Sequence, residues 1–182
     1  MYLSERELNL IGLASVGSNV KISPNARFYN PSGISIGNNV RIDDFVVVSG
    51  QVKIGNYVHL SINSAVISPR SQVTIGNFST ISFYACITSA NDDYSGKFMM
   101  NPTLPKQFTN VIDSPVIIGE HVALGSHSLV LPGVTLGKGC VVGAFSLVKV
   151  DIPSWSIYGG VPARLIGPRS REIIDLEKDL DV

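Results

Sequence analysis

Aliphatic residues recur along this chain at intervals of six, often with a glycine directly after them. An interval of six fits neither an amphipathic α-helix nor an alternating strand. It indicates short strands joined by tight corners, with one inward-facing aliphatic residue on each flat face. Three such faces close one triangular coil, and successive coils stack at the strand spacing of about 4.8 Å. The repeating positions are Val16, Ile22, Phe28, Ile36, Ile42, Val48, Ile54, Leu60, Val66, Ile75, Ile81, Ile87, Ile118, Leu124, Val130, Leu136, Val142 and Val148.

The repeat therefore predicts an all-β protein, a parallel β-helix over residues 16–165. Glycine and asparagine after the aliphatic residue, as in Ile36-Gly37-Asn38-Asn39, suit corners that need a positive φ. A capping box at Ser4-Glu5-Arg6-Glu7 predicts a helical N-terminal cap within residues 1–15. Ile173, Leu176 and Leu180 share one face of a short C-terminal helix within residues 166–182. Such caps cover strand edges that a β-helix would otherwise expose.

A long interruption separates the repeats that end near Asp93 from those that resume at Ile118. We expect a loop over about 94–117 to leave the β-helix, and a loop of this length is usually functional. Asp92 and Asp93 lie at its root, where carboxylates can take a proton, bind a cation or cap a turn.

Counting along the coils predicts which residues lie above one another on the outside of the β-helix. His59 should align with Thr80 and Ala123, Ser82 with Ser61 and Gly125, and Tyr84 with Asn63 and His127. We therefore expect His59, Ser82 and His127 to line one patch, with Asp92 arriving from a later corner or from a neighbouring chain.

These hexads resemble the hexapeptide-repeat acyltransferases, and the resemblance covers roughly residues 16–165. It implies a left-handed β-helix, a homotrimer and an acyl-CoA cosubstrate. Sugar O-acetyltransferases of this family carry a general-base histidine where this chain has Asn91. An alcohol needs a strong base to attack, whereas a neutral amine needs less help, so this departure favours an amine acceptor.

Two segments, Asn91-Asp92-Asp93-Tyr94-Ser95-Gly96 and Arg41-Ile42-Asp43-Asp44-Phe45, resemble the N-acyltransferases of nucleotide-linked amino sugars. That group includes enzymes of anthrose biosynthesis, which act on the 4-amine of a dTDP-linked 4-amino-4,6-dideoxyglucose.

The resemblance also implies roles for individual residues. The catalytic residues it implies are Asp92 and Ser82, which would flank the amine. The substrate contacts that we expect are His59, Asn91, Asp93 and Tyr84. The coenzyme A contacts that it implies are Ser126, Ala144, Lys149 and Arg164. We also expect Gly125, a small corner residue, to contact the coenzyme and to offer its N–H as an oxyanion donor. A further family arginine is replaced by Gly167, so that contact is missing or moved.

The amino-acid composition limits the kinds of binding partner that we expect for this protein. Fourteen basic and fourteen acidic residues give no net charge, which disfavours nucleic-acid binding. Only 15% of the residues are charged and 45% are hydrophobic, so we expect part of the surface to be buried by other copies of the chain. No apolar run approaches the length of a membrane helix and no export signal is visible, which favours the cytoplasm.

The sequence thus predicts an acyltransferase, most often using acetyl-CoA, that acts on the amine of a nucleotide-linked amino sugar for surface polysaccharide. One alternative is an O-acetyltransferase with Asp92 or His59 as the base. A remote alternative is a zinc-binding or non-catalytic scaffold. It is disfavoured because His59, His121 and His127 fall in different columns, and zinc needs ligands that converge. We expect no metal, and we expect His121 to be solvated.

Overall fold

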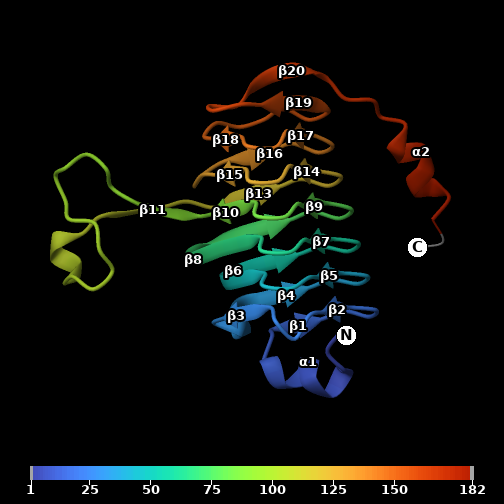
Figure 1. Cartoon of the computed structure of the whole chain (residues 1–182), viewed down its shortest axis with the longest axis horizontal. Helices are drawn as coiled ribbons and strands as arrows, with labels where there is room; N and C mark the ends of the chain where they lie inside the picture. The colour runs from blue at the N-terminus through green and yellow to red at the C-terminus, as the bar shows by residue number, and fades with distance from the viewer. Residues whose placement is uncertain (1, 181–182) are drawn as a thin grey trace.

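The computed structural model describes residues 2–180 as a left-handed parallel β-helix with three flat faces (Figure 1). Strand pairing between successive coils is parallel, and each strand inside the stack pairs with the strand one coil earlier and the strand one coil later. The predicted all-β architecture is therefore confirmed.

The strands divide among the three faces of the prism. Face 1 holds β2 (Lys21–Ile22), β5 (Arg41–Ile42), β7 (His59–Leu60), β9 (Thr80–Ile81), β14 (Ala123–Leu124), β17 (Val141–Val142) and β19 (Ser156–Gly159). Face 2 holds β3 (Arg27–Tyr29), the first halves of β6 (Val47–Ile54) and β8 (Ala65–Ile75), β10 (Cys86–Thr88), β15 (Leu129–Val130) and β18 (Leu147–Val148). Face 3 holds β1 (Ser15–Val16), β4 (Ile34–Ile36), the second halves of β6 and β8, β13 (Val116–Ile118) and β16 (Thr135–Leu136).

The register of the coils is the one that the six-residue interval predicts. On face 3 the Cα partners run from Ile36 through Ile54 and Ile75 to Ile118 and Leu136. Almost all of the repeating aliphatic side chains are buried, and together they form one continuous core inside the prism. This apolar burial is the main source of stability for the coil stack.

Three corners join the faces. Corner 1 joins face 1 to face 2 and consists of residues 23–26, 43–46, 61–64, 82–85, 125–128 and 143–146. Corner 3 joins face 3 to face 1 and consists of residues 17–20, 37–40, 55–58, 76–79, 119–122 and 137–140. Corner 2, between faces 2 and 3, carries the long interruption.

The corners use glycine for a different reason than the sequence suggested. Positive φ angles fall mostly on asparagine, histidine and aromatic residues, such as Tyr57 (55°) and Phe78 (59°), instead of on Gly37 or Gly55. Gly37 is required by close approach, because a Cβ there would lie 2.5 Å from Asn56 Oδ1. Tyr57 and Phe78 stack with ring centroids 5.1 Å apart, and this contact offsets the cost of the left-handed conformation.

The interruption is an antiparallel hairpin that projects away from the prism (Figure 1). Strand β11 (Ala90–Asp92) pairs with β12 (Val111–Asp113), and a short 3-10 helix, η2 (Lys106–Phe108), lies within the excursion. The excursion therefore begins and ends a few residues earlier than expected, because β13 has already rejoined face 3 at Val116. Its base is fixed by hydrogen bonds from Ser114 N to Ser89 O (2.9 Å) and from Ser71 N to Asp113 Oδ1 (2.7 Å).

The two ends of the prism are closed differently. Helix α1 (Glu5–Ile11) has the predicted capping box at Ser4 and ends at Gly12. A 3-10 turn, η1 (Pro31–Gly33), follows the first coil. At the other end β19 folds back antiparallel onto β20 (Arg164–Pro168), so strand structure extends past residue 165 before α2 (Ile173–Lys178). No described helix is long and apolar enough to cross a membrane.

The C-terminal segment covers corner 3, and this overturns one expectation. His121 is 7% exposed, not solvated, and its Nε2 lies 2.8 Å from Glu177 Oε2 of α2. Arg169 donates to the His121 carbonyl oxygen at 2.6 Å, and Arg171 lies over the Trp155 ring. The ring side chains Tyr57, Phe78, His121 and Trp155 form a column along corner 3. The chain's own C-terminal segment therefore packs against this column.

We expect Ile81→Ala to lower the unfolding free energy by about 2–5 kcal/mol, because Ile81 is fully buried and the alanine leaves a cavity. The matched control is Ile117→Ala, whose isoleucine is 47% exposed on face 3. Its cost should stay within about 0.5–1 kcal/mol. Chemical denaturation of both variants at one protein concentration measures the difference, and equal losses would contradict the assignment of the core.

Candidate active site

Corner 1 carries a straight column of outward residues, each one position after an inward aliphatic residue of face 1. The backbone ladder sets this column, with hydrogen bonds from Asp43 N to Leu60 O, from Ser61 N to Ile81 O and from Ser82 N to Leu124 O. The column consists of Ser23, Asp43, Ser61, Ser82, Gly125 and Gly143. Ser82 thus lies between a polar N-terminal half and a C-terminal half made of small residues.

The C-terminal half of corner 1 consists of small residues on closely packed coils. A Cβ on Gly125 would lie 2.5 Å from Ala144 N, so only glycine fits between these coils. Ser126 and Ala144 follow on adjacent coils, and Phe145 N donates to Ser126 O at 2.9 Å. The structure therefore brings together three of the residues expected to contact coenzyme A.

The other two expected coenzyme contacts lie elsewhere. Lys149 is exposed just after β18, where face 2 ends. Arg164 is exposed at the start of β20, next to Ala163, whose N–H bonds to Leu147 O of β18 at 2.8 Å. Both cations therefore lie near the C-terminal end of the prism and outside corner 1.

The Gly125 amide cannot serve as the oxyanion donor that was expected. Its N–H is already donated to Val142 O at 2.8 Å, as part of the ladder between coils. Among the hydrogen bonds of residues 2–180, the amide of Ser126 has no acceptor. At this corner the next amide along the chain, that of Ser126, is the one that remains free to donate.

A column of stacked rings lies beside these small residues. The Tyr84 ring stacks on His127 with centroids 4.8 Å apart, and His127 stacks on Phe145 at 4.7 Å. The predicted alignment of Tyr84 with His127 is confirmed. Phe145 extends the column by one coil and was missed, although it occupies the same position after its inward valine.

The N-terminal half of corner 1 holds a charged network centred on Asp43. His59 Nε2 lies 2.7 Å from Asp43 Oδ2, and Arg41 Nε donates to Asp43 Oδ1 at 2.6 Å. Burial acts to raise the pKa of Asp43, but the hydrogen bonds from His59 and Arg41 outweigh it and hold that pKa below its usual value. Asp43 is therefore ionised at neutral pH, and it orients both partners.

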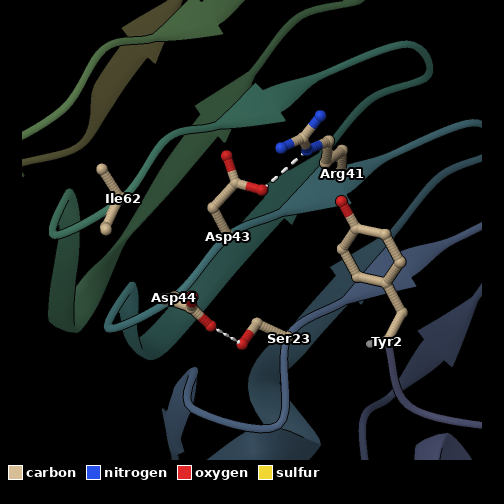
Figure 2. Close-up of a pocket in the computed structure, with 6 residues that line it drawn as sticks. All are labelled: Tyr2, Ser23, Arg41, Asp43, Asp44 and Ile62. Atoms are coloured by element: carbon tan, nitrogen blue, oxygen red, sulfur yellow. Dashed lines mark hydrogen bonds and ion pairs between the residues drawn. The ribbon is translucent and has the colours of Figure 1, made fainter.

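A cavity of about 390 Å³ opens beside this network, as Figure 2 shows. Its lining consists of Tyr2, Ser23, Arg41, Asp43, Asp44 and Ile62. Ser23 donates its hydroxyl to Asp44 Oδ1, and Asn25 donates to the same oxygen at 3.2 Å. The counting that aligned Ser82 with Ser61 reaches Asp43 and Ser23 when it is carried two coils back, so the sequence held a signal for this site.

Asn91 and Asp92 lie at the root of the hairpin on β11. They line a second cavity of about 390 Å³, together with apolar side chains that include Ile67, Pro102 and Val111. The Asn91 side chain donates to the Asp92 carbonyl oxygen at 2.8 Å. Neither carboxylate oxygen of Asp92 has a hydrogen-bond partner among the described residues.

Asp93 is bound within the hairpin. Its Oδ1 accepts from Ser95 N at 2.7 Å and its Oδ2 accepts from Asn110 Nδ2 at 2.9 Å. The hydrogen bonds from Ser95 and Asn110 lower the pKa of Asp93. This is the turn-capping use of an aspartate that the sequence left open, and a substrate contact by Asp93 stays a prediction.

Ser82 and Asp92 do not meet within one chain. Ser82 precedes β10 at corner 1, and Asp92 follows β10 at corner 2, so one whole face separates them (Figure 1). The cavity that contains Asp92 does not contain Ser82. Of the two sources considered for Asp92, a later corner of the same chain is therefore excluded by the topology.

Neither cysteine is poised for chemistry. Burial raises the pKa of Cys140 to about 12 and also raises the pKa of Cys86. His59 lies on face 1 in β7, His127 lies at corner 1, and His121 lies at corner 3 against α2. Residues 2–180 contain no cluster of three or more histidine, cysteine, aspartate or glutamate side chains that could hold a metal ion.

Comparisons with known proteins identify the relatives of this chain. Residues 115–144 match the family model for the hexapeptide repeat of succinyl-transferase. The dTDP-4-amino-4,6-dideoxy-D-glucose acyltransferase of Escherichia coli is 45% identical over 179 residues, which are 97% of this chain and 93% of that protein. A putative lipopolysaccharide biosynthesis O-acetyl transferase of E. coli (strain K12) is 35% identical, over 79% of this chain and 76% of that protein.

Solved structures show the same relationship. AntD, an N-acyltransferase from Bacillus cereus, in complex with dTDP and 3-hydroxybutyryl-CoA, superposes with a TM-score of 0.96 and 46% identity, covering 98% of this chain and 95% of AntD. Another AntD structure contains dTDP-4-amino-4,6-dideoxyglucose and coenzyme A. Because identity and fold extend over nearly the whole chain, the protein belongs to the hexapeptide-repeat family of acyl-CoA-dependent N-acyltransferases that act on nucleotide-linked amino sugars.

Proposed function

We propose that this protein transfers an acyl group from acyl-CoA to the 4-amine of a dTDP-linked 4-amino-4,6-dideoxy sugar. We place it in the cytoplasm as a homotrimer, with a product destined for surface polysaccharide. The observation that carries this proposal is the match over nearly the whole chain to enzymes that bind dTDP-sugar and coenzyme A. Acetyl is the simplest acyl group, and the AntD complex with 3-hydroxybutyryl-CoA makes a longer one an explicit candidate.

The chemistry needs little from the protein beyond positioning. The neutral amine attacks the thioester carbonyl carbon, a C–N bond forms and the C–S bond breaks. Asp92 and Ser82 orient the amine, and its proton passes either to Asp92 or to the leaving thiolate. His59, Asn91 and Tyr84 contact the sugar nucleotide around them.

Corner 1 supplies the coenzyme side of the reaction. The pantetheine arm lies along the small residues Gly125, Ser126 and Ala144, where a bulky side chain would block it. The free amide of Ser126 stabilises the oxyanion, a donor worth roughly 3 kcal/mol in comparable enzymes. Lys149 and Arg164, near the end of the prism, pair with the phosphates of the coenzyme.

The trimer completes the site. Phe83 and Phe145 are exposed at corner 1 by 45% and 67%, and Met99, Met100 and Phe108 are exposed on the hairpin by 50–55%. Apolar surface of this kind is typically covered by a partner. Packing the hairpin of one copy against corner 1 of the next covers both surfaces and brings Asp92 to Ser82 of the neighbouring chain.

The second candidate function is O-acetylation of a sugar hydroxyl, favoured by the relative that is 35% identical. Its base would have to be Asp92 or His59, because this chain has Asn91 where sugar O-acetyltransferases of the family carry histidine. We expect kcat/KM on the nucleotide-linked amino sugar to exceed that on the same sugar with a hydroxyl at the reacting carbon by about 10²-fold or more, because no histidine at position 91 takes the hydroxyl proton. Paired kinetics measure the ratio, and equal values or activity on the hydroxyl alone would favour O-acetylation.

Replacement of Asp92 should show whether Asp92 or the coenzyme sulfur accepts the proton of the amine. If Asp92 orients the amine and takes its proton, Asp92→Asn should lower kcat by about 10²–10⁴-fold. If the coenzyme sulfur takes the proton, the loss should be smaller and fall mainly on KM for the sugar. His127→Asn is the control and should stay within about tenfold. Near-normal kinetics of Asp92→Asn beside an inactive His59→Asn would move the chemistry from Asp92 to His59.

Mixing variants tests whether the site is shared between chains. Ser82→Ala and Asp92→Asn should each be impaired, but trimers reassembled from an equal mixture should recover intact Ser82–Asp92 pairs at about a quarter of the sites. This follows because each mixed trimer contains one site with both native residues. Activity that stays at the level of the separate variants, with exchange of subunits verified by mass spectrometry, would place both residues in one chain.

A further inference from the structure

We infer that Asp113 is a positioning residue for the reaction, which places Asp92 by anchoring the root of the hairpin to the body of the prism. This inference rests on the proposed function, because it takes Asp92 to be the group that meets the acceptor amine. Asp113 itself lies outside the set of expected site residues, and it acts through Asp92 without touching a substrate.

The anchor is the hydrogen bond from Ser71 N to Asp113 Oδ1, at 2.7 Å, which joins residues 42 positions apart in the chain. Ser71 lies in the part of β8 that turns corner 2, and Asp113 is the last residue of β12. Among the hydrogen bonds of residues 2–180, this one alone joins residues 90–113 to a distant part of the prism. The hairpin projects freely elsewhere (Figure 1), so this contact is the polar link that orients its root.

The prism side of the anchor is itself held by buried serines. Ser68 donates its hydroxyl to the Ser71 carbonyl oxygen, and Ser89 donates its hydroxyl to Ser68 Oγ at 3.4 Å. Ser68 and Ser89 are both fully buried, and Ser89 O accepts from Ser114 N directly after β12. The amide that Asp113 binds therefore has a fixed position in the prism.

The pairing of β11 with β12 transmits that position to Asp92. Asp113 lies opposite Ala90, and Val111 lies opposite Asp92. Because alternate residues of a strand project to the same side, Asp92 and Asp113 share one face of the hairpin. They are diagonal neighbours, roughly 7–8 Å apart. The hydrogen bonds of the hairpin fix this register, so a displacement of Asp113 also displaces Asp92.

The second oxygen of Asp113 indicates that this carboxylate does more than stabilise the fold. Asp113 Oδ2 is buried and has no hydrogen-bond partner among the described residues. A buried, unpaired carboxylate oxygen opposes folding. A carboxylate accepts a shorter and stronger hydrogen bond from a backbone N–H than a neutral group does. The unfavourable burial is thus accepted at a place where the orientation of the hairpin matters.

The first test is steady-state kinetics of the full-length protein carrying Asp113→Ala, which removes the acceptor, or Asp113→Asn, which keeps one. Asp113→Ala should lower kcat/KM for the amino sugar by about tenfold or more, because Asp92 is misplaced. KM for acyl-CoA should not change. Asp113→Asn should recover most of the loss, and a loss as large as that of Asp113→Ala would overturn the inference.

The matched control is Asp151→Ala. Asp151 Oδ1 accepts from Thr135 N, also at 2.7 Å, and Asp151 lies at corner 2 on a later coil that carries no hairpin. The same kind of hydrogen bond is therefore removed away from Asp92, and kcat/KM for the sugar should stay within about twofold of the wild type.

A double-mutant cycle tests whether Asp113 acts through Asp92. In the Asp92→Asn background, Asp113→Ala should change kcat/KM for the sugar by less than about threefold, because the group that it positions has already been removed. A full additional loss in the double variant would mean that Asp113 supports the fold or another part of the site, and would overturn the inference.

Hydrogen exchange, measured by mass spectrometry, gives a readout that does not depend on activity. Asp113→Ala should speed exchange of the Ser71 amide and of the β11–β12 amides by about tenfold or more, whereas Asp151→Ala should not. Unchanged exchange in Asp113→Ala would refute the anchor. If exchange responds as expected but the wild type acylates no amino sugar, the anchor stands and the proposed function fails. If the wild type acylates the sugar while Asp113→Ala keeps its kcat/KM, the function stands and the positioning role fails.

Discussion

The stacking of each coil on the previous one, residue above residue, determines the rest of this structure. Backbone hydrogen bonds between coils and the inward aliphatic side chains impose the same register on every face. Outward residues therefore form straight columns. The backbone hydrogen bonds between coils, and not side-chain packing, set the relative positions of the functional side chains in one column. Corner 1 shows this best, since Asp43, Ser82 and Gly125 share a column across distant parts of the sequence.

The same ladder allows the hairpin to leave the prism without breaking it. Face 3 resumes at β13, which pairs directly with β8, so the coils on either side of the excursion stay in register. The hairpin carries Asp92 at a root that is held by Ser89, Ser114 and Asp113. A rigid root places the carboxylate accurately, while the apolar outer part remains free to contact another chain.

Features that depend only on the ladder could be predicted from the sequence, and those that depend on distant segments could not. The alignments of His59 with Thr80 and of Tyr84 with His127 follow from counting, because six residues advance one face and the longer intervals, Val66 to Ile75 and Ile87 to Ile118, both fall at corner 2. The burial of His121 depends on a C-terminal segment that folds back over corner 3, which no local pattern encodes. Likewise, the bond between His59 and Asp43 depends on side-chain rotamers. The role of Gly37 depends on how closely two coils approach.

The residues that build the prism are separate from those that would contact the acceptor. This separation explains how one fold can accommodate acceptors of different chemistry. The residues that define the prism point inward, whereas Ser82, Asn91 and the lining of the Asp43 cavity point outward or lie on the hairpin. Exchanging histidine for asparagine at position 91 changes the base available to the acceptor but removes no inward contact and no hydrogen bond of the ladder. Relatives with amine and with hydroxyl acceptors can therefore share this scaffold. The residues of the outward columns and of the hairpin root then determine which acceptor is used.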